Sequence, residues 1–304
     1  MKILFFGTPC FAEMVLQGLL DAGKEVVGVV CQNDKPAGRG NKMVSPKIVS
    51  LARENGIAVY QFERLKTHIE DFKNIDYDLA VTASYGKILP KELLDLKLCI
   101  NVHPSMLPKY RGATPIQSAL LNGDKVTGVS IMKTEVGMDD GDIYAQEAVE
   151  ISEDDDYVSL LPKLANVGIS LLLETIDKIE NGTAVRTPQN EAKATFVKPI
   201  QKEEGLLDFN EPVESLVNKV RAFTESPVAY LVIGGERIKV FKAAIADVCT
   251  AANVGEIIPN KKRFLIKAKD GVFEILECQA AGGKRMAAIN FKNGYRFKAQ
   301  VVDL

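Results

Sequence analysis

The sequence predicts an α/β protein: a parallel β-sheet covered by helices on both faces, followed by a small antiparallel β-barrel. Between residues 3 and 179, short apolar runs alternate with segments that carry apolar residues at helical spacing, as in parallel sheets buried on both faces. Residues 183–204 are polar and interrupted by Pro188 and Pro199, which is typical of a linker. Beyond them, turn pairs such as Gly234-Gly235 separate short β-rich runs, which indicates a small barrel.

The individual elements follow from local signals. Gly7-Thr8-Pro9 closes the first strand, Gly23 stops the first helix, and Asn181-Gly182 ends a long amphipathic helix. In the first part we expect strands at 3–7, 26–31, 58–60, 79–83, 99–103 and 127–133, and helices at 11–20, 48–55, 114–121 and 156–179. In the last part we expect a helix at 213–223 and strands at 229–233, 237–243, 263–268, 272–279 and 296–302.

Composition excludes several classes of protein. The chain has 304 residues, 46% of them apolar, and a mean hydropathy of +0.01, which suits two domains with their own cores. No apolar run reaches the about eighteen residues of a membrane span, and no small-residue cleavage site follows the apolar start of the chain. We therefore expect a soluble, cytoplasmic protein with no membrane partner. Five scattered cysteines without a CxxC pair, and two histidines, predict neither a disulfide framework nor a zinc site.

The charge distribution adds a weaker indication. The net charge of −2 argues against wholesale wrapping of nucleic acid, and we expect no DNA partner. Residues 205–304 carry 15 basic against 11 acidic side chains, so the C-terminal third is the more cationic part. Such a modest excess is also common on an ordinary solvated surface.

Polar residues follow the ends of the predicted strands, where open parallel sheets bind ligands. The strand at 99–103 ends in Asn101-Val102-His103, and strand alternation places Asn101 and His103 on one face. A Gly-flanked acidic loop at 135–143 follows the strand at 127–133. One of its aspartates could face His103 and fix its tautomer. The turn after the first strand lacks the GxGxxG pattern, which disfavours a dinucleotide cofactor.

An amide, an imidazole and a carboxylate that converge at strand ends form a coherent acyl-transfer site. The amide would stabilise a developing oxyanion, the imidazole would move protons, and the carboxylate would orient the imidazole. Taken singly, each feature has a simpler interpretation: His103 could be a buried structural histidine, and the aspartate could cap a turn.

These residues resemble a known family. The run Asn101-x-His103-Pro104-Ser105-Met106-Leu107-Pro108 resembles the Asn-x-His-x-Ser-Leu-Leu-Pro signature of folate-dependent formyltransferases, with Met106 in place of the first leucine. The step Asp139-x-Gly141 resembles the family's catalytic aspartate loop. Members that act on methionyl-tRNA are similar in further stretches: Gly7-Thr8-Pro9-x-Phe11-Ala12, Gln32-x-Asp34-Lys35-Pro36-Ala37-Gly38-Arg39-Gly40, Tyr85-Gly86-x-Ile88-Leu89-Pro90, Arg111-Gly112-Ala113-x-Pro115-Ile116-Gln117 and Arg221-Ala222-Phe223.

The resemblance implies a Rossmann-like catalytic domain at 1–188, a linker at 189–204 and a tRNA-binding, OB-like barrel at 205–304. It implies formyl transfer from 10-formyltetrahydrofolate to the α-amino group of initiator methionyl-tRNA, without a metal. Asn101 and a protonated His103 would stabilise the charge on the formyl oxygen. Asp139 would hold His103 and relay the proton of the amine through a water molecule.

The resemblance also implies binding residues. The folate pocket would be lined by Ser105, Met106, Leu107 and Pro108, together with Tyr85 and Gly86. The basic loop at 34–42 would contact the acceptor stem of the tRNA through Lys35, Arg39 and Lys42. In the barrel, a cluster at 261–269 that contains five basic residues is either a second tRNA contact or a charged turn.

Two other functions fit parts of the pattern. A formyltransferase for the amine of a sugar nucleotide would keep Asn101, His103 and Asp139 but would not need Arg39. A non-catalytic folate-binding or RNA-binding module would keep the fold, and the intact set of site residues argues against it.

Overall fold

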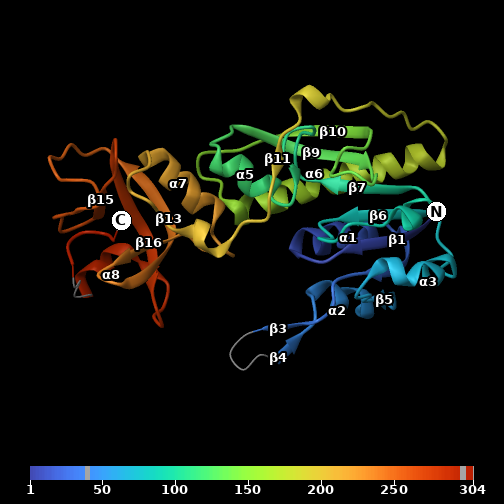
Figure 1. The fold of residues 1–304 in the computed structure, drawn as a ribbon, viewed down its shortest axis with the longest axis horizontal. Helices are drawn as coiled ribbons and strands as arrows, with labels where there is room; N and C mark the ends of the chain where they lie inside the picture. Colours follow the sequence, from blue (N-terminus) through green and yellow to red (C-terminus); the bar gives the residue numbers. More distant parts are fainter. Residues whose placement is uncertain (38–41, 295–298, 304) are drawn as a thin grey trace. The chain divides into compact units, whose positions relative to one another are not determined.

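The computed structural model of the chain describes residues 1–37, 42–294 and 299–303 (Figure 1). The chain divides into two compact units. The first unit comprises Met1–Pro115, Val126–Glu150 and Leu161–Lys198. The second unit comprises Ile116–Lys125, Ile151–Leu160 and Pro199–Leu304. Two short segments inserted in the first unit therefore belong to the second.

A seven-stranded sheet forms the centre of the first unit, in the order β10-β9-β7-β6-β1-β2-β5. Its strands are β1 (Lys2–Gly7), β2 (Glu25–Val30), β5 (Ala58–Tyr60), β6 (Leu79–Ala83), β7 (Cys99–His103), β9 (Val126–Lys133) and β10 (Ile143–Glu150). The first five are parallel, as the apolar runs predict.

Two strands at one edge of this sheet depart from the prediction. The sequence predicts β9 as one more strand of a parallel sheet, but it runs antiparallel to β7. Strand β10, which runs antiparallel to β9, was not predicted at all. Its side chains are partly or fully exposed. Its sequence, Ile-Tyr-Ala-Gln-Glu-Ala-Val-Glu, neither alternates apolar and polar residues nor forms one apolar run, so the hydrophobic pattern alone does not identify it as a strand.

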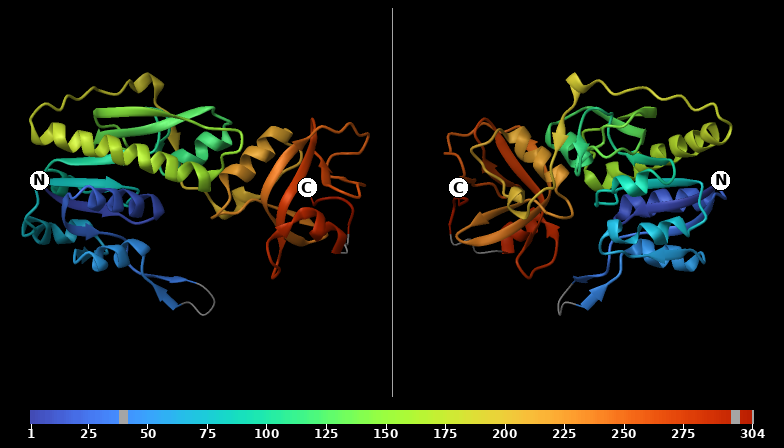
Figure 2. Two further views of the ribbon diagram at one scale, coloured as in Figure 1. Left: turned by 180° about the vertical axis from the view of Figure 1, so that it is seen from behind. Right: turned by 45° about the vertical axis from the view of Figure 1, so that its right-hand side comes forward.

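Helices cover both faces of the sheet (Figures 1 and 2). They are α1 (Cys10–Asp21), α2 (Lys47–Glu54), α3 (Ile69–Lys73), α4 (Lys91–Leu94) and α6 (Tyr157–Glu180), with a 3-10 turn, η1, at Leu65–His68. Helix α5 (Pro115–Leu121) lies, apart from its first residue, in a segment that belongs to the second unit. The backbone of Gly23 after α1 has φ +69, a conformation that favours glycine. The Asp156 carboxylate accepts the Ser159 N–H at 2.9 Å and so caps the start of α6.

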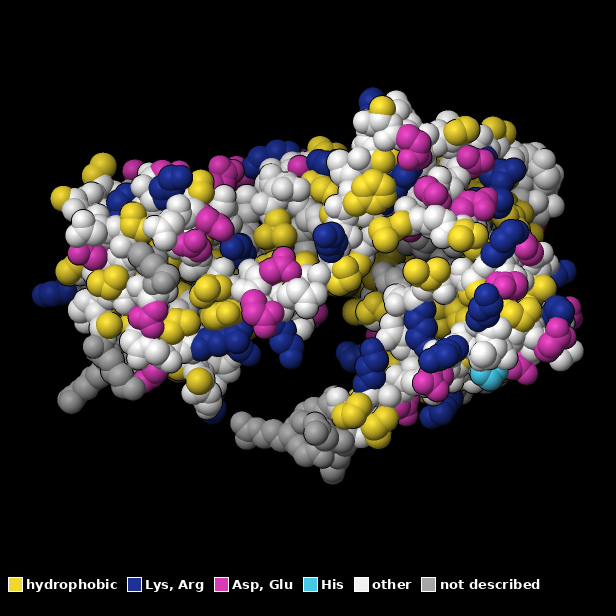
Figure 3. Space-filling model, in the orientation of Figure 1, with side chains coloured by type: hydrophobic (Ala, Val, Ile, Leu, Met, Phe, Trp, Pro, Cys, Tyr) yellow, Lys and Arg dark blue, Asp and Glu magenta, His cyan; other side chains and the backbone are white. Residues whose placement is uncertain are grey.

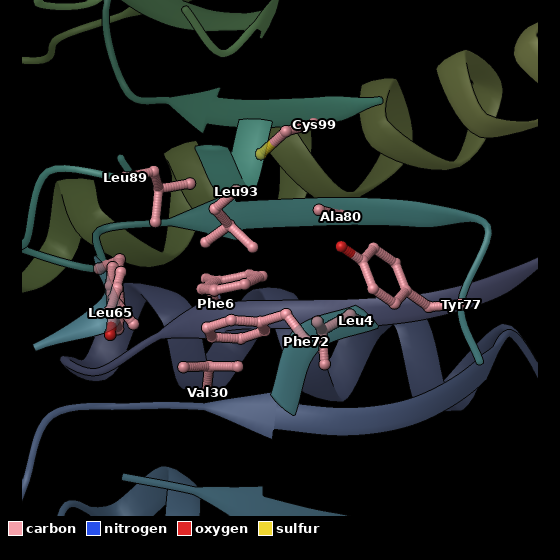
Figure 4. Close-up of a cluster of buried hydrophobic side chains, with 11 residues drawn as sticks. Leu4, Phe6, Val30, Leu65, Phe72, Tyr77, Ala80, Leu89, Leu93 and Cys99 are labelled. Atoms are coloured by element: carbon pink, nitrogen blue, oxygen red, sulfur yellow. The ribbon is translucent and has the colours of Figure 1, made fainter. Parts of the chain in front are cut away.

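Strand alternation divides the core of the first unit between the two faces. Leu4 and Phe6 of β1 point to the face covered by η1, α3 and α4, where they pack in a buried cluster with Phe72 (Figure 4). On the other face, α6 lies so close to β7 and β9 that a Cβ at Gly168 would be 3.0 Å from the Val102 side chain. Cys99 belongs to the first cluster. Asn101 and His103 therefore point to the same face as Cys99, opposite α6.

Among the described residues, α6 alone is long and apolar enough to cross a membrane by length and composition. Half of its most apolar window is buried inside the structure. Many of the apolar residues of α6 are therefore the ones that pack on the sheet.

Two small sheets lie beside the main one. Strands β3 (Lys35–Ala37) and β4 (Lys42–Val44) form a hairpin, which the sequence did not predict. Strand β8 (Arg111–Gly112) pairs in parallel with β11 (Phe196–Val197). Strand β11 lies in the segment predicted as a linker, together with the 3-10 turns η2 (Glu191–Lys193) and η3 (Lys202–Gly205).

The second unit contains a curled antiparallel sheet, in the order β12-β13-β16-β15-β14 with β17 beside β16, consistent with the predicted barrel. Its elements are α7 (Val213–Ala222), β12 (Tyr230–Ile233), β13 (Glu236–Ala246), β14 (Ile257–Ile258), β15 (Phe264–Lys267), β16 (Val272–Ala280), β17 (Met286–Ala287) and α8 (Ala288–Gly294). Register shifts around Val240–Ala243 bend β13, as bulges do. The strand predicted at 296–302 lies partly outside the described residues, and its described part forms only an isolated bridge at Val301.

Candidate active site

Asn101 and His103 lie at the carboxyl end of β7, on the same face of the sheet. Thr82 of the adjacent parallel strand β6 pairs with Asn101, and its hydroxyl donates to Asn101 Oδ1 at 2.8 Å. The amide nitrogen Nδ2 faces Asp139, whose Oδ1 it approaches at 3.3 Å. Because a carboxylate can only accept, this contact fixes the orientation of the amide, and its oxygen then faces Thr82.

The imidazole of His103 is buried, with 4% of its surface exposed. Its Nε2 lies 2.9 Å from the backbone oxygen of Tyr110. A carbonyl oxygen can only accept, so Nε2 carries a hydrogen and Nδ1 is the nitrogen that can take up or release a proton. Nδ1 faces Asp139 Oδ2 at 3.6 Å, which leaves the second nitrogen directed at the carboxylate.

Asp139 reaches this pair from the loop between β9 and β10. Its Oδ2 accepts the backbone N–H of Gly112 at 2.8 Å, and its backbone has φ +50, a region that is uncommon outside glycine. If β9 ran parallel to β7, this loop would begin next to His103, at the carboxyl end of β7. Because β9 is antiparallel to β7, the loop begins at the opposite end. It begins beside the first residue of β7, where Thr134 N–H donates to Cys99 O, and then extends to Asn101. The three side chains of the predicted site thus lie together, by a different chain path.

The run from Ser105 to Pro108, predicted to line a folate pocket, follows directly after β7. Ser105 is fully buried and its hydroxyl donates to Lys109 O at 2.6 Å. The Ser130 hydroxyl donates to Ser105 O at 2.6 Å and accepts Leu107 N–H at 3.1 Å. Ser130 was missed by the sequence analysis, although it is the residue of β9 paired with His103. Met106 packs on Gly128, where a Cβ would be 2.4 Å from its sulfur.

Tyr85 and Gly86 follow the carboxyl end of β6. The ring of Tyr85 is buried against Phe6 in an edge-to-face arrangement, with ring centroids 5.6 Å apart. Gly86 has φ +75, and Gln32 donates to Tyr85 O at 3.1 Å. The loop therefore presents its backbone, and not the tyrosine ring, at the edge of the sheet.

The predicted tRNA-contacting loop coincides with the β3–β4 hairpin. Lys35 is exposed, and its Nζ donates to Gln32 Oε1 at 2.6 Å. Arg39 and the side chain of Lys42 lie outside the described residues. Asp34, just before the hairpin, accepts hydrogen bonds from Gln61 and Ser45, which lower the pKa of its carboxyl group.

A buried arginine beside the site was not recognised as a site residue from the sequence. Arg111 is 2% exposed and forms an ion pair with Glu191, with Nη2 2.6 Å from Oε1. The hydrogen bond from Arg111 lowers the pKa of the Glu191 carboxyl. Gly112, which holds Asp139, is the next residue along the chain. Among the described residues, no group of three or more His, Cys, Asp and Glu side chains could hold a metal ion.

In the second unit, one residue of the predicted basic cluster is neutralised, because Arg263 forms an ion pair with Glu274. Lys267 donates to the uncharged Gly271 O at 3.4 Å and keeps its charge unpaired by that contact. A second basic surface lies on β12 and β13, where Arg237 stacks on the Tyr230 ring at 3.4 Å. Arg285 lies 4.4 Å from the ring of Phe241, but it forms an ion pair with Glu277, with Nη2 2.6 Å from Oε2. On the face drawn in Figure 3, basic and acidic side chains are interspersed.

Comparison with known proteins gives consistent matches over both units. Residues 1–176 match a family model described as formyl transferase, and residues 199–296 match one described as formyl transferase, C-terminal domain. A methionyl-tRNA formyltransferase from Sulfurihydrogenibium is 40% identical, with 98% of each chain covered. One from Lactobacillus acidophilus is 42% identical, over 96% of this chain and 95% of its own.

Solved structures with lower identity share the fold. WlaRD, a sugar 3N-formyl transferase, has a TM-score of 0.68 at 22% identity and covers 93% of this chain and 99% of its own. HypX from Aquifex aeolicus in complex with tetrahydrofolic acid has a TM-score of 0.69 at 17% identity. It covers 96% of this chain, which corresponds to 46% of HypX. With relatives of about 40% identity over nearly their whole length, the chain belongs to the methionyl-tRNA formyltransferase family.

Proposed function

We propose that this chain transfers the formyl group of 10-formyltetrahydrofolate to the α-amino group of initiator methionyl-tRNA, in the cytoplasm and without a metal. The observation that carries the proposal is the 40% identity to a methionyl-tRNA formyltransferase over 98% of both chains. The amine of a sugar nucleotide is the less favoured acceptor, because the solved sugar formyltransferase WlaRD shares only 22% identity with this chain.

The first step is attack of the amine nitrogen on the formyl carbon, which places negative charge on the formyl oxygen. Asn101 is suited to stabilise this charge, because its contacts with Asp139 and Thr82 together hold the amide nitrogen toward the carboxylate. One Nδ2 hydrogen is directed at Asp139, and the other would donate to the oxyanion. Protonated His103 would add a positive charge next to the same oxygen.

His103 and Asp139 would then handle the proton of the amine. The distance of 3.6 Å from His103 Nδ1 to Asp139 Oδ2 is longer than a hydrogen bond. A water molecule in the site, beside both groups, would carry the proton. In the balanced step, a bond forms between the amine nitrogen and the formyl carbon, the bond from that carbon to N10 of the folate breaks, and the amine proton goes to N10.

The folate would bind beside Ser105–Pro108 and the backbone of Tyr85–Gly86. Both segments follow the carboxyl ends of β7 and β6, the edge at which parallel sheets bind ligands. The acceptor stem of the tRNA would be contacted by Lys35, Arg39 and Lys42. In the second unit, we favour the surface of Arg237 and Tyr230 for further tRNA contacts, since an exposed cation beside an aromatic ring suits both phosphates and bases.

The proposal is tested by following labelled formyl from 10-formyltetrahydrofolate to charged initiator methionyl-tRNA, with uncharged tRNA and free methionine as controls. We expect label on the charged tRNA only, transfer abolished by His103→Asn, and transfer weakened by Arg39→Ala. The partly exposed His68 and the exposed Arg64 supply matched variants, His68→Asn and Arg64→Ala, which should transfer at the wild-type rate. Folate turnover without labelled tRNA would move the acceptor to a small amine. Absence of any turnover would contradict the enzymatic function itself.

A further inference from the structure

The side chain of Arg111 is buried but has an unusually complete set of partners. Its Nε and Nη2 donate to Gln189 Oε1 at 3.0 and 2.9 Å. Its Nη1 and Nη2 donate to the two carboxylate oxygens of Glu191 at 2.9 and 2.6 Å. A buried guanidinium is tolerated only when its donors are satisfied, and a two-pronged pair with a carboxylate also fixes its orientation. Arg111 is therefore a rigid point in the first unit.

Gln189 connects this rigid point to the loop that carries Asp139. Because the guanidinium can only donate, the amide oxygen of Gln189 must face Arg111. The amide nitrogen then faces the loop, and it donates to Asp139 O and Gly141 O, both at 2.8 Å. One amide group thus binds both backbone carbonyls that bracket Asp140. It does so from a position 50 residues away in sequence from Asp139.

The loop held in this way is tightly constrained on its other sides. Asp139 has φ +50, a conformation that persists only where the surroundings impose it. At Gly141, a Cβ would be 2.0 Å from Lys133 O, so the backbone there lies directly against β9. The Asp139 carboxylate is held by the N–H of Gly112, the neighbour of Arg111. Arg111 therefore acts on Asp139 twice, through Gln189 on the backbone and through Gly112 on the carboxylate.

We propose that Gln189 is a positioning residue for Asp139: its amide, oriented by Arg111, holds the aspartate loop in the conformation in which the carboxylate faces Asn101 and His103. This inference rests on the proposed function, in which Asp139 relays the proton of the amine. Gln189 touches no reacting atom itself. The residue lies in the segment whose composition predicts a linker, so its part in the site is not apparent from the sequence.

The sharpest test is Gln189→Glu, which keeps the shape and the acceptor oxygen that faces Arg111. It replaces the donor by a second oxygen that faces two carbonyls, so the loop should be pushed away. Asn190→Asp is the matched control: it introduces the same charge one residue further on and keeps the acceptor for Ala192 N–H. We expect Gln189→Glu to lower kcat for formyl transfer by about tenfold or more, whereas Asn190→Asp stays within about twofold of the wild type.

A second measurement separates positioning from a merely structural role. In the background of Asp139→Asn, whose residual transfer is followed in single turnovers, Gln189→Glu should have little further effect, since both changes act through the same carboxylate. A fully additive loss, or a wild-type kcat in Gln189→Glu, would overturn the proposal. Should circular dichroism show that Gln189→Glu is unfolded, Gln189→Met decides instead: a loss of about tenfold supports the inference, and a rate within about twofold of the wild type overturns it.

The wild-type chain in the same assay keeps the two proposals apart. If it transfers no formyl group, the proposed function fails. If it transfers formyl and Gln189→Glu does so equally well, only the positioning role of Gln189 fails.

Discussion

Gly112 offers the most direct test of how the backbone holds the site. Its N–H donates to Asp139 Oδ2 at 2.8 Å, its φ is +114, and a Cβ there would be 2.3 Å from the backbone oxygen of Val197. The substitution Gly112→Ala therefore introduces backbone strain and a collision at once. The clashing atom belongs to the backbone of β11, which is paired with β8, so no side-chain rotation can relieve the collision.

The size of the effect follows from these distances. An ordinary contact begins at 3.4 Å, so the methyl group and Val197 O must separate by a further 1.1 Å. A movement of that size at Gly112 would take its N–H out of hydrogen-bonding range of Asp139. A hydrogen bond to a charged group contributes about 1.5–3 kcal/mol, so kcat should fall by about 10- to 150-fold. The positive φ alone should lower the free energy of unfolding by about 1–3 kcal/mol.

Formyl transfer at saturating substrates gives kcat, and urea unfolding followed by circular dichroism gives stability, since the chain has no tryptophan. Gly182→Ala is the control, because Gly182 has φ +67 with open space around a Cβ. It should lose about 1–2 kcal/mol of stability through its left-handed φ and keep the wild-type kcat. A wild-type kcat in Gly112→Ala would refute the argument that this N–H positions Asp139.

Three further predictions follow from the site and its surroundings. Asn101→Ala should lower kcat by about 10²–10³-fold with a smaller effect on KM, as loss of an oxyanion donor does; a change confined to KM would argue for a binding role. The Arg111 hydrogen bond lowers the pKa of Glu191 in the folded chain, so its contribution to stability is present above pH 4.5 and is lost as the pH falls below that value. As the pH is lowered through this acidic range, the urea midpoint of Glu191→Gln should accordingly fall less than that of the wild type. An equal fall in both proteins would contradict a stabilising role of the ionised Glu191. A thiol reagent at pH 8 should modify the exposed Cys10 and Cys249 in the native chain, and the other three cysteines only after unfolding, because burial raises the pKa of their thiols to about 11–12; rapid modification of a third thiol would show that the buried set is more accessible than the structure implies.

The local sequence pattern was sufficient to predict those features that depend only on a residue's own strand or helix. The same-face placement of Asn101 and His103 follows from alternation alone, and the parallel core strands follow from their apolar runs. The direction of β9 and the existence of β10 depend on pairing at a partly exposed edge, which leaves little trace in hydrophobicity. Gln189 could not be found from the sequence, because its partners lie about 50 and 80 positions away and its own segment is polar.

The interleaving of the two units bears on how such a chain can be recombined. The backbone passes between the units five times along its length. Within the second unit, Arg221 donates to the backbone oxygens of Asp155 and Ser152, which come from one of the inserted segments. A gene fusion that exchanged only the residues after Lys198 would separate these partners. An exchange of the C-terminal portion should therefore include residues 116–125 and 151–160, so that the hydrogen bonds of Arg221 keep both partners.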